Sequence, residues 1–217
     1  PQWFISMDSH KLRNKALKAI DETTFYPSKG KERLKSMIET RPDWCVSRQR
    51  VWGVPLPIFI NKKTNKILVD DEVFENIAKI YEKEGSDCWF SDDPQKFLGK
   101  NYKAEDFEKL SDIVEVWFDS GSTHSFVLEK RKDLKWPASM YLEGSDQHRG
   151  WFHSSLLESC GTRDRAPFES ILSHGFVVDG KGLKMSKSLG NVIAPEDILK
   201  KYGADILRIW VASSNYA

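Results

Sequence analysis

The chain has 217 residues, 40% of them hydrophobic and 30% charged, the composition of a soluble globular protein with one domain, or with one domain and a small satellite. No apolar run approaches the ~20 residues that a membrane-spanning helix needs, so we expect no membrane partner. The 33 basic and 32 acidic residues leave a net charge of +1. Any contact with nucleic acid must therefore come from a local patch rather than from the overall field.

Cys45, Cys88 and Cys160 lie far apart and form no C-x-x-C pair. An odd, scattered set of cysteines argues against a disulfide framework and against a zinc site, and it fits the reducing cytoplasm. We therefore expect a cytoplasmic protein without a zinc site, whose thiols are structural.

The first forty residues are predicted to form a strand, over residues 1–7, and two helices. Asp8 or Ser9 is a suitable N-cap for the first helix. Its apolar face consists of Leu12, Ala16, Leu17 and Ile20. The second helix starts at Ser28 and ends before Pro42, and its apolar stripe consists of Leu34, Met37 and Ile38.

Residues 41–57 combine three arginines, two tryptophans and three prolines. Such a stiff, cationic segment fits a surface for anions or nucleic acid. It fits equally well a loop that is fixed by arginine–carboxylate pairs, and the residues alone leave both interpretations open.

Residues 59–69 are predicted to form a hairpin across a Lys/Thr/Asn turn. Asp70 or Asp71 then caps a helix whose apolar side consists of Val73, Phe74, Ile77, Ile80 and Tyr81. We interpret residues 61–110 as a small inserted α+β module, with Trp89 and Phe97 in its core.

Two further segments look like strands that end in small polar turns. Residues 113–118 alternate like a strand and lead into Asp-Ser-Gly-Ser-Thr-His, and residues 139–143 lead into Gly144 and a helix opened by Asp146, Gln147 and His148. Open α/β sheets bind ligands at such strand ends. The apolar residues predicted for that helix are Phe152, Leu156, Leu157 and Cys160.

Residues 171–191 contain a predicted strand, 171–178, followed by a glycine-rich turn, 179–182, and a lysine-rich loop. Lys181, Lys184 and Lys187 alternate there with serines, ahead of Gly190. Movable ammonium groups and hydroxyl donors on a glycine-hinged loop suit a polyphosphate ligand; the alternative is a solvated basic turn. Pro195 then starts a helix that Gly203 stops, and residues 204–212 form another.

Residues 184–188, Lys-Met-Ser-Lys-Ser, are identical to the signature loop of class I aminoacyl-tRNA synthetases. Residues 47–53, S-R-Q-R-V-W-G, resemble a segment that follows the editing insertion in the isoleucyl, valyl and leucyl enzymes. The strings at 119–124 and 141–152 resemble the bacterial isoleucyl-tRNA synthetases, whereas the valyl and leucyl enzymes diverge in both. The chain is thus similar, along its whole length, to that group.

The resemblance implies roles for individual residues. Lys184 and Lys187 match the phosphate-gripping lysines, and Lys187 is the more directly catalytic. Residues matching the ATP and adenylate site are Glu143, Gly144, Asp146, Gln147, His174, Gly175 and Lys187. Trp117 and Trp151 match the two indoles of the amino-acid pocket. The alternatives are ordinary ones: Asp146 as a helix cap, the indoles as core residues and His174 as a structural histidine.

The resemblance also implies a fold: α/β, the second half of a Rossmann-like parallel-sheet catalytic domain. The implied divisions are re-entry into the catalytic domain (1–60), an inserted connective module (61–110), a nucleotide-binding half (111–190) and the start of a helical stem region (191–217). The family's His-x-Gly-His motif is absent, since the five histidines never have that spacing. We therefore expect this C-terminal part of the catalytic domain to need its N-terminal half and to be inactive alone.

The implied reaction is the activation of L-isoleucine by Mg²⁺-ATP to isoleucyl-adenylate, followed by transfer to tRNA(Ile). Two other functions stay open. One is a fragment of a valyl-tRNA synthetase, and the other is a non-catalytic nucleotide- or RNA-binding module that kept the lysine loop.

Overall fold

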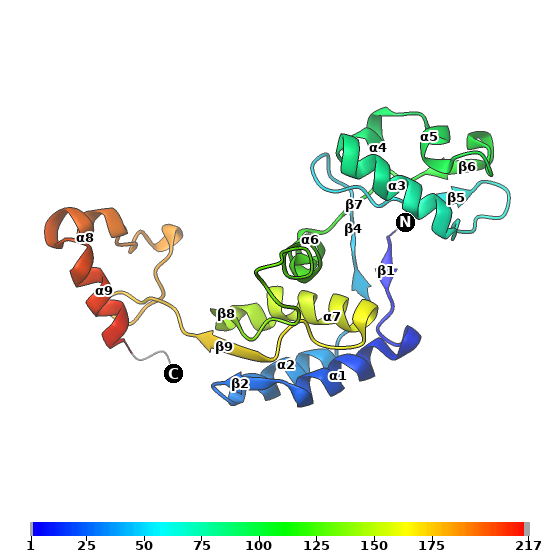
Figure 1. Ribbon diagram of the computed structural model, residues 1–217. Helices are drawn as coiled ribbons and strands as arrows, with labels where there is room; N and C mark the ends of the chain where they lie inside the picture. Colours follow the sequence, from blue (N-terminus) through cyan, green and yellow to red (C-terminus); the bar gives the residue numbers. More distant parts are fainter. Residues whose placement is uncertain (1, 215–217) are drawn as a thin grey trace.

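The computed structural model describes residues 2–214, and Figure 1 shows its helices and strands. These residues contain two separate hydrophobic cores. The larger core lies between a parallel sheet and three helices. The sheet has the order β2 (Thr24–Tyr26), β9 (Ser170–His174), β8 (Tyr141–Gly144), and both pairings are parallel. A parallel sheet confirms the predicted α/β class.

Among residues 2–214, helices cover one face of this sheet and leave the other exposed. Phe25, Ile171 and Tyr141 are aligned across the three strands and all are buried. Their neighbours along the strands, Tyr26 and Leu142, point the other way and are 52% and 56% exposed. The covered face packs against α1 (Leu12–Glu22), α2 (Lys29–Glu39) and α7 (Trp151–Arg163).

The helices bury the predicted apolar faces, because their apolar residues recur every three or four positions. Helix α2 follows Ser28, as predicted, and α7 buries Phe152, Leu156, Leu157 and Cys160. The predicted cap of α1 is wrong. Residues Ser9–Lys11 form a 3₁₀ turn, η1, so α1 starts after Lys11, which is left-handed (φ 59°) and makes no side-chain cap.

Strand β2 was not predicted, because three residues between two helices carry no periodic signal. Two predicted strands are shorter than expected. The N-terminal one is β1 (Phe4–Ile5), which pairs antiparallel with β3 (Trp44–Cys45); Pro1 lies outside the described residues. The strand predicted at 171–178 ends at His174, because β2 ends opposite Leu172 and β8 ends opposite His174, which leaves Phe176 to Val178 without partner strands in this sheet.

The strand predicted at 113–118 is wrong for most of its length. Strand β7 (Ile113–Val114) pairs antiparallel with β4 (Ser47–Arg48), outside the parallel sheet. Helix α6 (Val116–Gly121) follows, because Glu115 caps it by accepting a hydrogen bond from the Trp117 backbone N–H at 3.4 Å. A π-helical turn, η3 (His124–Leu128), comes next.

The smaller core lies within residues 59–109. Its elements are β5 (Phe59–Asn61), α3 (Asp71–Glu84), α4 (Cys88–Ser91), α5 (Pro94–Leu98), η2 (Ala104–Asp106) and β6 (Phe107–Lys109). Trp89 and Phe97 are fully buried with ring centroids 5.0 Å apart, which confirms their predicted core position. Asp70 caps α3, as predicted. The hairpin prediction is only partly right, since the main partner of β5 is β6 and residue 67 forms a single bridge.

After the lysine loop and its short turn η5 (Lys187–Leu189), the chain forms α8 (Pro195–Tyr202) and α9 (Ala204–Ser213). Helix α8 has the predicted bounds and α9 ends one residue later than predicted, and Figure 1 shows both helices reaching away from the sheet. Among residues 2–214, no helix has the length and apolar character to cross a membrane.

Candidate active site

Four of the predicted site residues form the turn at the carboxyl end of β8. Gly144 ends the strand, and η4 (Ser145–His148) follows directly. The Asp146 carboxylate folds over Gly144: a Cβ on that glycine would lie 2.6 Å from Asp146 Oδ1. A glycine is therefore required there for the carboxylate to reach the strand end.

Gln147, and not Asp146, stabilises the start of α7. Its Oε1 accepts a hydrogen bond from the Trp151 backbone N–H at 2.9 Å, whereas Asp146 makes no cap. The Gln147 amide donates to Asp146 Oδ2 at 3.3 Å. The Asp146 carboxylate is exposed and free of helix capping, which leaves it available to a ligand.

Gly150 lies beside the indole of Trp117 and directly precedes Trp151 in the chain. A Cβ on Gly150 would lie 2.9 Å from the Trp117 ring and 2.5 Å from Gln147 Oε1. Trp151 follows Gly150 and donates its indole N–H to the Ser120 carbonyl at 3.1 Å. Helix α6, the element that replaced a predicted strand, thus carries Trp117 to the Gln147 turn.

His174 and Gly175 lie at the carboxyl end of β9, and His174 is in register with Gly144 of β8. The next residue, Phe176, connects this strand end to the lysine loop. Its ring lies 3.7 Å from the position of a Cβ on Gly144, and the Lys184 ammonium lies 3.6 Å from its centroid. The structure therefore brings Lys184 to the same edge of the sheet as the β8 turn.

The lysine loop is closed by a pair of polar side chains, Asp179 and Asn191. Asp179 Oδ1 accepts hydrogen bonds from the backbone N–H groups of Lys181 and Leu183, both at 2.9 Å. Asn191 donates to Asp179 Oδ2 at 2.9 Å and accepts from the Ser186 N–H at 2.9 Å. The hydrogen bond from Asn191 is the main reason why the pKa of Asp179 lies below its ordinary value.

Lys187 is exposed at the start of η5. Within residues 2–214, neither Lys184 nor Lys187 forms an ion pair, and Lys181 forms none either. Two exposed ammonium groups without a carboxylate partner are free to meet an anionic ligand.

The cationic segment 41–57 supports both of the interpretations left open by sequence. Arg48 pairs with Glu115 at 3.4 Å, and Arg41 lies over the Trp44 ring at 5.5 Å. Glu115 also accepts from the Trp44 indole at 2.8 Å, so these groups hold the start of α6 in place. Arg50 and Trp52, by contrast, are exposed, the indole by 91%.

Sequence reasoning missed several residues around this edge. A cavity of about 430 Å³ opens beside the β8 turn, where β2 and β9 end, and Lys29 and Arg33 line it together with Ser145 and His174. The signal was two cations four residues apart at a helix start. Because β2 was not predicted, no feature of the sequence placed the start of α2 next to the carboxyl ends of β8 and β9. Phe176, Tyr141 and the Asp179–Asn191 pair were missed because their importance depends on contacts across the fold.

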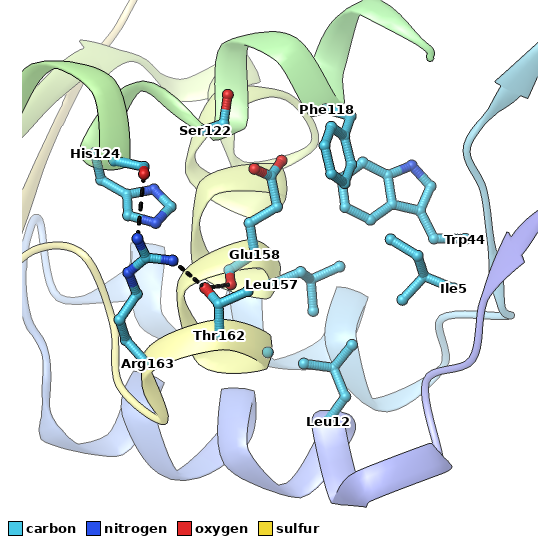
Figure 2. Close-up of a pocket in the computed structure, with 12 residues that line it drawn as sticks. Ile5, Leu12, Trp44, Phe118, Ser122, His124, Leu157, Glu158, Thr162 and Arg163 are labelled. Carbon is cyan, nitrogen blue, oxygen red and sulfur yellow. Dashed lines mark hydrogen bonds between the residues drawn. The ribbon is translucent and has the colours of Figure 1, made fainter. Parts of the chain in front are cut away.

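A second cavity, of about 410 Å³, lies between α6 and α7 and contains none of the predicted site residues (Figure 2). Glu158 points into it beside Phe118 and Ser122, over an apolar floor that includes Trp44 and Leu157. Burial, together with the nearby carboxylates of Asp119 and Glu115, raises the pKa of Glu158 to about 9. The Glu158 carboxyl is therefore protonated at neutral pH.

Comparison with known proteins identifies relatives along the whole chain. The chain is 86% identical, over 217 residues, to isoleucine--tRNA ligase of Pelagibacter ubique (strain HTCC1062), and 58% identical, over 222 residues, to that of Brucella abortus biovar 1 (strain 9-941). Both alignments cover all of this chain, but they cover only 24% of the Pelagibacter protein and 23% of the Brucella protein. The chain thus spans about a quarter of the length of these curated relatives.

Two solved structures show the same fold. Methionyl-tRNA synthetase of Mycobacterium tuberculosis, bound by methionyl-adenylate, matches 96% of this chain and 32% of its own, with a TM-score of 0.57 and 19% identity. The Agrobacterium radiobacter K84 agnB2 LeuRS-tRNA-LeuAMS complex matches 80% of this chain and 24% of its own, with a TM-score of 0.55 and 23% identity. Both likenesses support a Rossmann-like catalytic-domain fold.

The family model described as tRNA synthetases class I (I, L, M and V) matches residues 1–217. Together with the strand-end site and the 86% identical relative, this match shows that the chain belongs to the class I tRNA synthetase family.

Proposed function

We propose that the full-length protein containing this chain activates L-isoleucine with Mg²⁺-ATP and transfers it to tRNA(Ile). The chain would be the later part of the catalytic domain, which carries the KMSKS loop. The observation that carries the proposal is the meeting of the lysine loop with the Glu143–Gln147 turn through Lys184 and Phe176. The choice of isoleucine is supported by the relatives, which are named isoleucine--tRNA ligase.

In this proposal the isoleucine carboxylate attacks the α-phosphate of ATP, pyrophosphate leaves, and isoleucyl-adenylate forms. A ribose hydroxyl of tRNA(Ile) then attacks the acyl carbon, the ester forms, and AMP leaves. No covalent bond to the protein is needed, so the protein acts by positioning the reactants and by stabilising charge. Lys184 and Lys187 meet the charge that develops on the leaving pyrophosphate.

The turn after β8 holds the other parts of the adenylate. The carboxylates of Glu143 and Asp146 and the Gln147 amide supply acceptors for the ribose hydroxyls and the amino group. His174 and Gly175 line the nucleotide from β9. Trp117 and Trp151, on either side of Gly150, enclose the isoleucine side chain.

Magnesium enters this proposal as part of the substrate. Among residues 2–214, no group of three or more His, Cys, Asp or Glu side chains lies close enough to hold a metal ion. Phosphate oxygens are preferred ligands of Mg²⁺ in nucleotide sites, so the ion would be bound chiefly through ATP and would be positioned with it.

The domain divisions remain part of the proposal. The separate core around Trp89 and Phe97 supports residues 61–110 as an inserted module, and the exposed α8 and α9 support residues 191–217 as the start of a stem region. Residues 1–60 and 111–190 then form the catalytic part. The missing N-terminal half would cover the bare sheet face beside Leu142. We also place the protein in the cytoplasm, in keeping with three free cysteines.

ATP–pyrophosphate exchange by the full-length protein, with isoleucine, valine, leucine and methionine in turn, tests the proposal. We expect isoleucine to give the highest kcat/KM, and we expect the charging of tRNA(Ile) to follow. A preference for valine would instead assign the chain to a valyl-tRNA synthetase. ATP binding without exchange for any amino acid would favour the non-catalytic binding module.

A further inference from the structure

Trp151 is held by contacts on several sides. Its ring is stacked face to face on Tyr141, with the centroids 4.0 Å apart and the planes at 4°. The indole N–H donates to the Ser120 carbonyl at 3.1 Å, and the backbone N–H donates to Gln147. A tryptophan side chain has only two rotatable bonds, so a stacked face together with a bonded edge leaves it one orientation.

Tyr141 is itself firmly fixed. It is 4% exposed and lies on β8, two residues before Glu143. Its hydroxyl shares a 3.2 Å hydrogen bond with the Ser155 hydroxyl, one turn after Trp151 on α7. Phe168 packs against the Tyr141 ring at 4.9 Å and 58°. The Tyr141 ring therefore fixes the Trp151 indole relative to strand β8. The proposed adenylate turn, Glu143–Gln147, begins on the same strand.

We propose that Tyr141 is a specificity-determining positioning residue, which fixes the Trp151 indole and thereby the width of the amino-acid pocket. This inference rests on the proposed function, because it treats Trp151 as a wall of that pocket. Tyr141 is buried behind the indole, so it acts through Trp151 and not by touching the substrate.

A smaller, flexible side chain at position 141 opens space behind the indole. The indole then tilts away from the ligand, and its contact with the δ-methyl group of isoleucine is weakened. That methyl group is what distinguishes isoleucine from valine. Discrimination should fall more than the rate of the chemical step, because the lysine loop and the β8 turn are left in place.

The test uses the full-length enzyme and compares Tyr141→Leu, Tyr141→Phe and Phe168→Leu. Wild-type exchange with isoleucine is measured first; its absence would overturn the proposed function itself. Tyr141→Leu is expected to lower the isoleucine-to-valine ratio of kcat/KM by roughly tenfold, the scale of one methylene group. The change should appear mainly in the isoleucine KM. Tyr141→Phe keeps the ring and should stay within about twofold of wild type.

Phe168→Leu is the matched control, since among the described residues Phe168 has a ring contact with Tyr141 but none with Trp151. It should lower Tm much as Tyr141→Leu does, but it should change the ratio far less, because the Tyr141 ring stays stacked on Trp151 and keeps its hydrogen bond to Ser155. Adding Tyr141→Leu to Trp151→Ala should not change the ratio further, because the two act through one indole.

If Tyr141→Leu does not accumulate as folded enzyme, Tyr141→Met carries the same expectation, because it keeps apolar volume and removes the flat ring. The inference is overturned if the leucine or methionine variant loses stability like Phe168→Leu but keeps the wild-type ratio. It is also overturned if Tyr141→Phe relaxes the ratio as much as the leucine variant does.

Discussion

The ammonium of Lys184 lies 3.6 Å from the centroid of the Phe176 ring. This cation–π contact holds one lysine of the loop against the sheet edge, whereas among residues 2–214 Lys187 makes no such ring contact. Gly182 precedes the Lys184–Ser188 segment and Gly190 follows it. Their φ values are 77° and 64°, and glycine adopts such a left-handed conformation without strain. Closure of the loop onto ATP would therefore move Lys187 chiefly, between two glycine hinges.

Lys187→Ala is expected to slow adenylate formation with little effect on isoleucine affinity, because the ammonium meets charge that develops only as pyrophosphate leaves. The loss in transition-state stabilisation should be on the order of 2.7–4 kcal/mol, as for one preorganised donor. Pre-steady-state adenylate formation measures it. Lys181→Ala, in the same loop, is the control and should have a small effect. Equal rates for the Lys187 variant and wild type would contradict the assignment.

Asn191→Ala should lower kcat for activation and raise the KM for ATP, since the side chain joins Asp179 to the Ser186 backbone and so shapes the loop between the lysines. Lost hydrogen bonds of this kind cost about 0.5–1.5 kcal/mol each. Asn101→Ala, which removes an exposed hydrogen bond to Glu72 in residues 59–109, away from the loop, is the comparison. Unchanged ATP kinetics in the Asn191 variant would show that the pair is merely structural.

Trp151→Ala is expected to relax the preference for isoleucine over valine, because it removes a wall of the proposed pocket. One methylene is worth about 1–3 kcal/mol in such a pocket, a value that comes from isoleucyl-tRNA synthetases themselves. Exchange kinetics with the two amino acids give the ratio. The control is Trp89→Phe, in the separate core, which should not change the isoleucine-to-valine ratio. An unaltered ratio in Trp151→Ala would remove Trp151 from the pocket.

Glu158→Gln is expected to stabilise the enzyme at alkaline pH. The carboxyl has a pKa of about 9 in the folded state and an ordinary value of 4.5. Stability is therefore unaffected by this group below about pH 4.5, and it falls as the pH rises towards 9, because only the unfolded chain ionises freely. The penalty near pH 8 is on the order of a few kcal/mol. Tm at pH 5.5 and pH 8.5 should differ less in the variant; an identical pH dependence would mean that Glu158 ionises normally.

The 217-residue chain alone is not expected to form isoleucyl-adenylate at a measurable fraction of the rate of the whole enzyme. The lysine loop and the β8 turn form one wall of the site, and the sheet face at Tyr26 and Leu142 is uncovered. Weak ATP binding through the lysines should persist. Pyrophosphate exchange with and without the N-terminal half of the catalytic domain, added in trans, is the measurement. Robust isoleucine-dependent exchange by the chain alone would overturn the proposal.

Local signals were enough for much of the chain. Asp70 was recognisable as a helix cap, Gly203 as a helix stop, and residues 179–190 as a glycine-containing loop. Each of these depends on neighbours within a few residues, which is the range over which caps, turns and periodicity act.

The rest was decided by contacts between residues far apart in the chain. β2 exists because Phe25 can pair beside Ile171, and residues 116–121 became a helix because Glu115 caps them while it binds Trp44 and Arg48. Gln147 replaced Asp146 as the cap of α7. The stacking of Tyr141 on Trp151 and the contact of Lys184 with Phe176 likewise join separate elements. The sequence by itself therefore determined the local elements and the chemistry of the loop. Only the tertiary structure decided which strands pair and which side chains hold the site in place, because long-range pairing and burial override local preference.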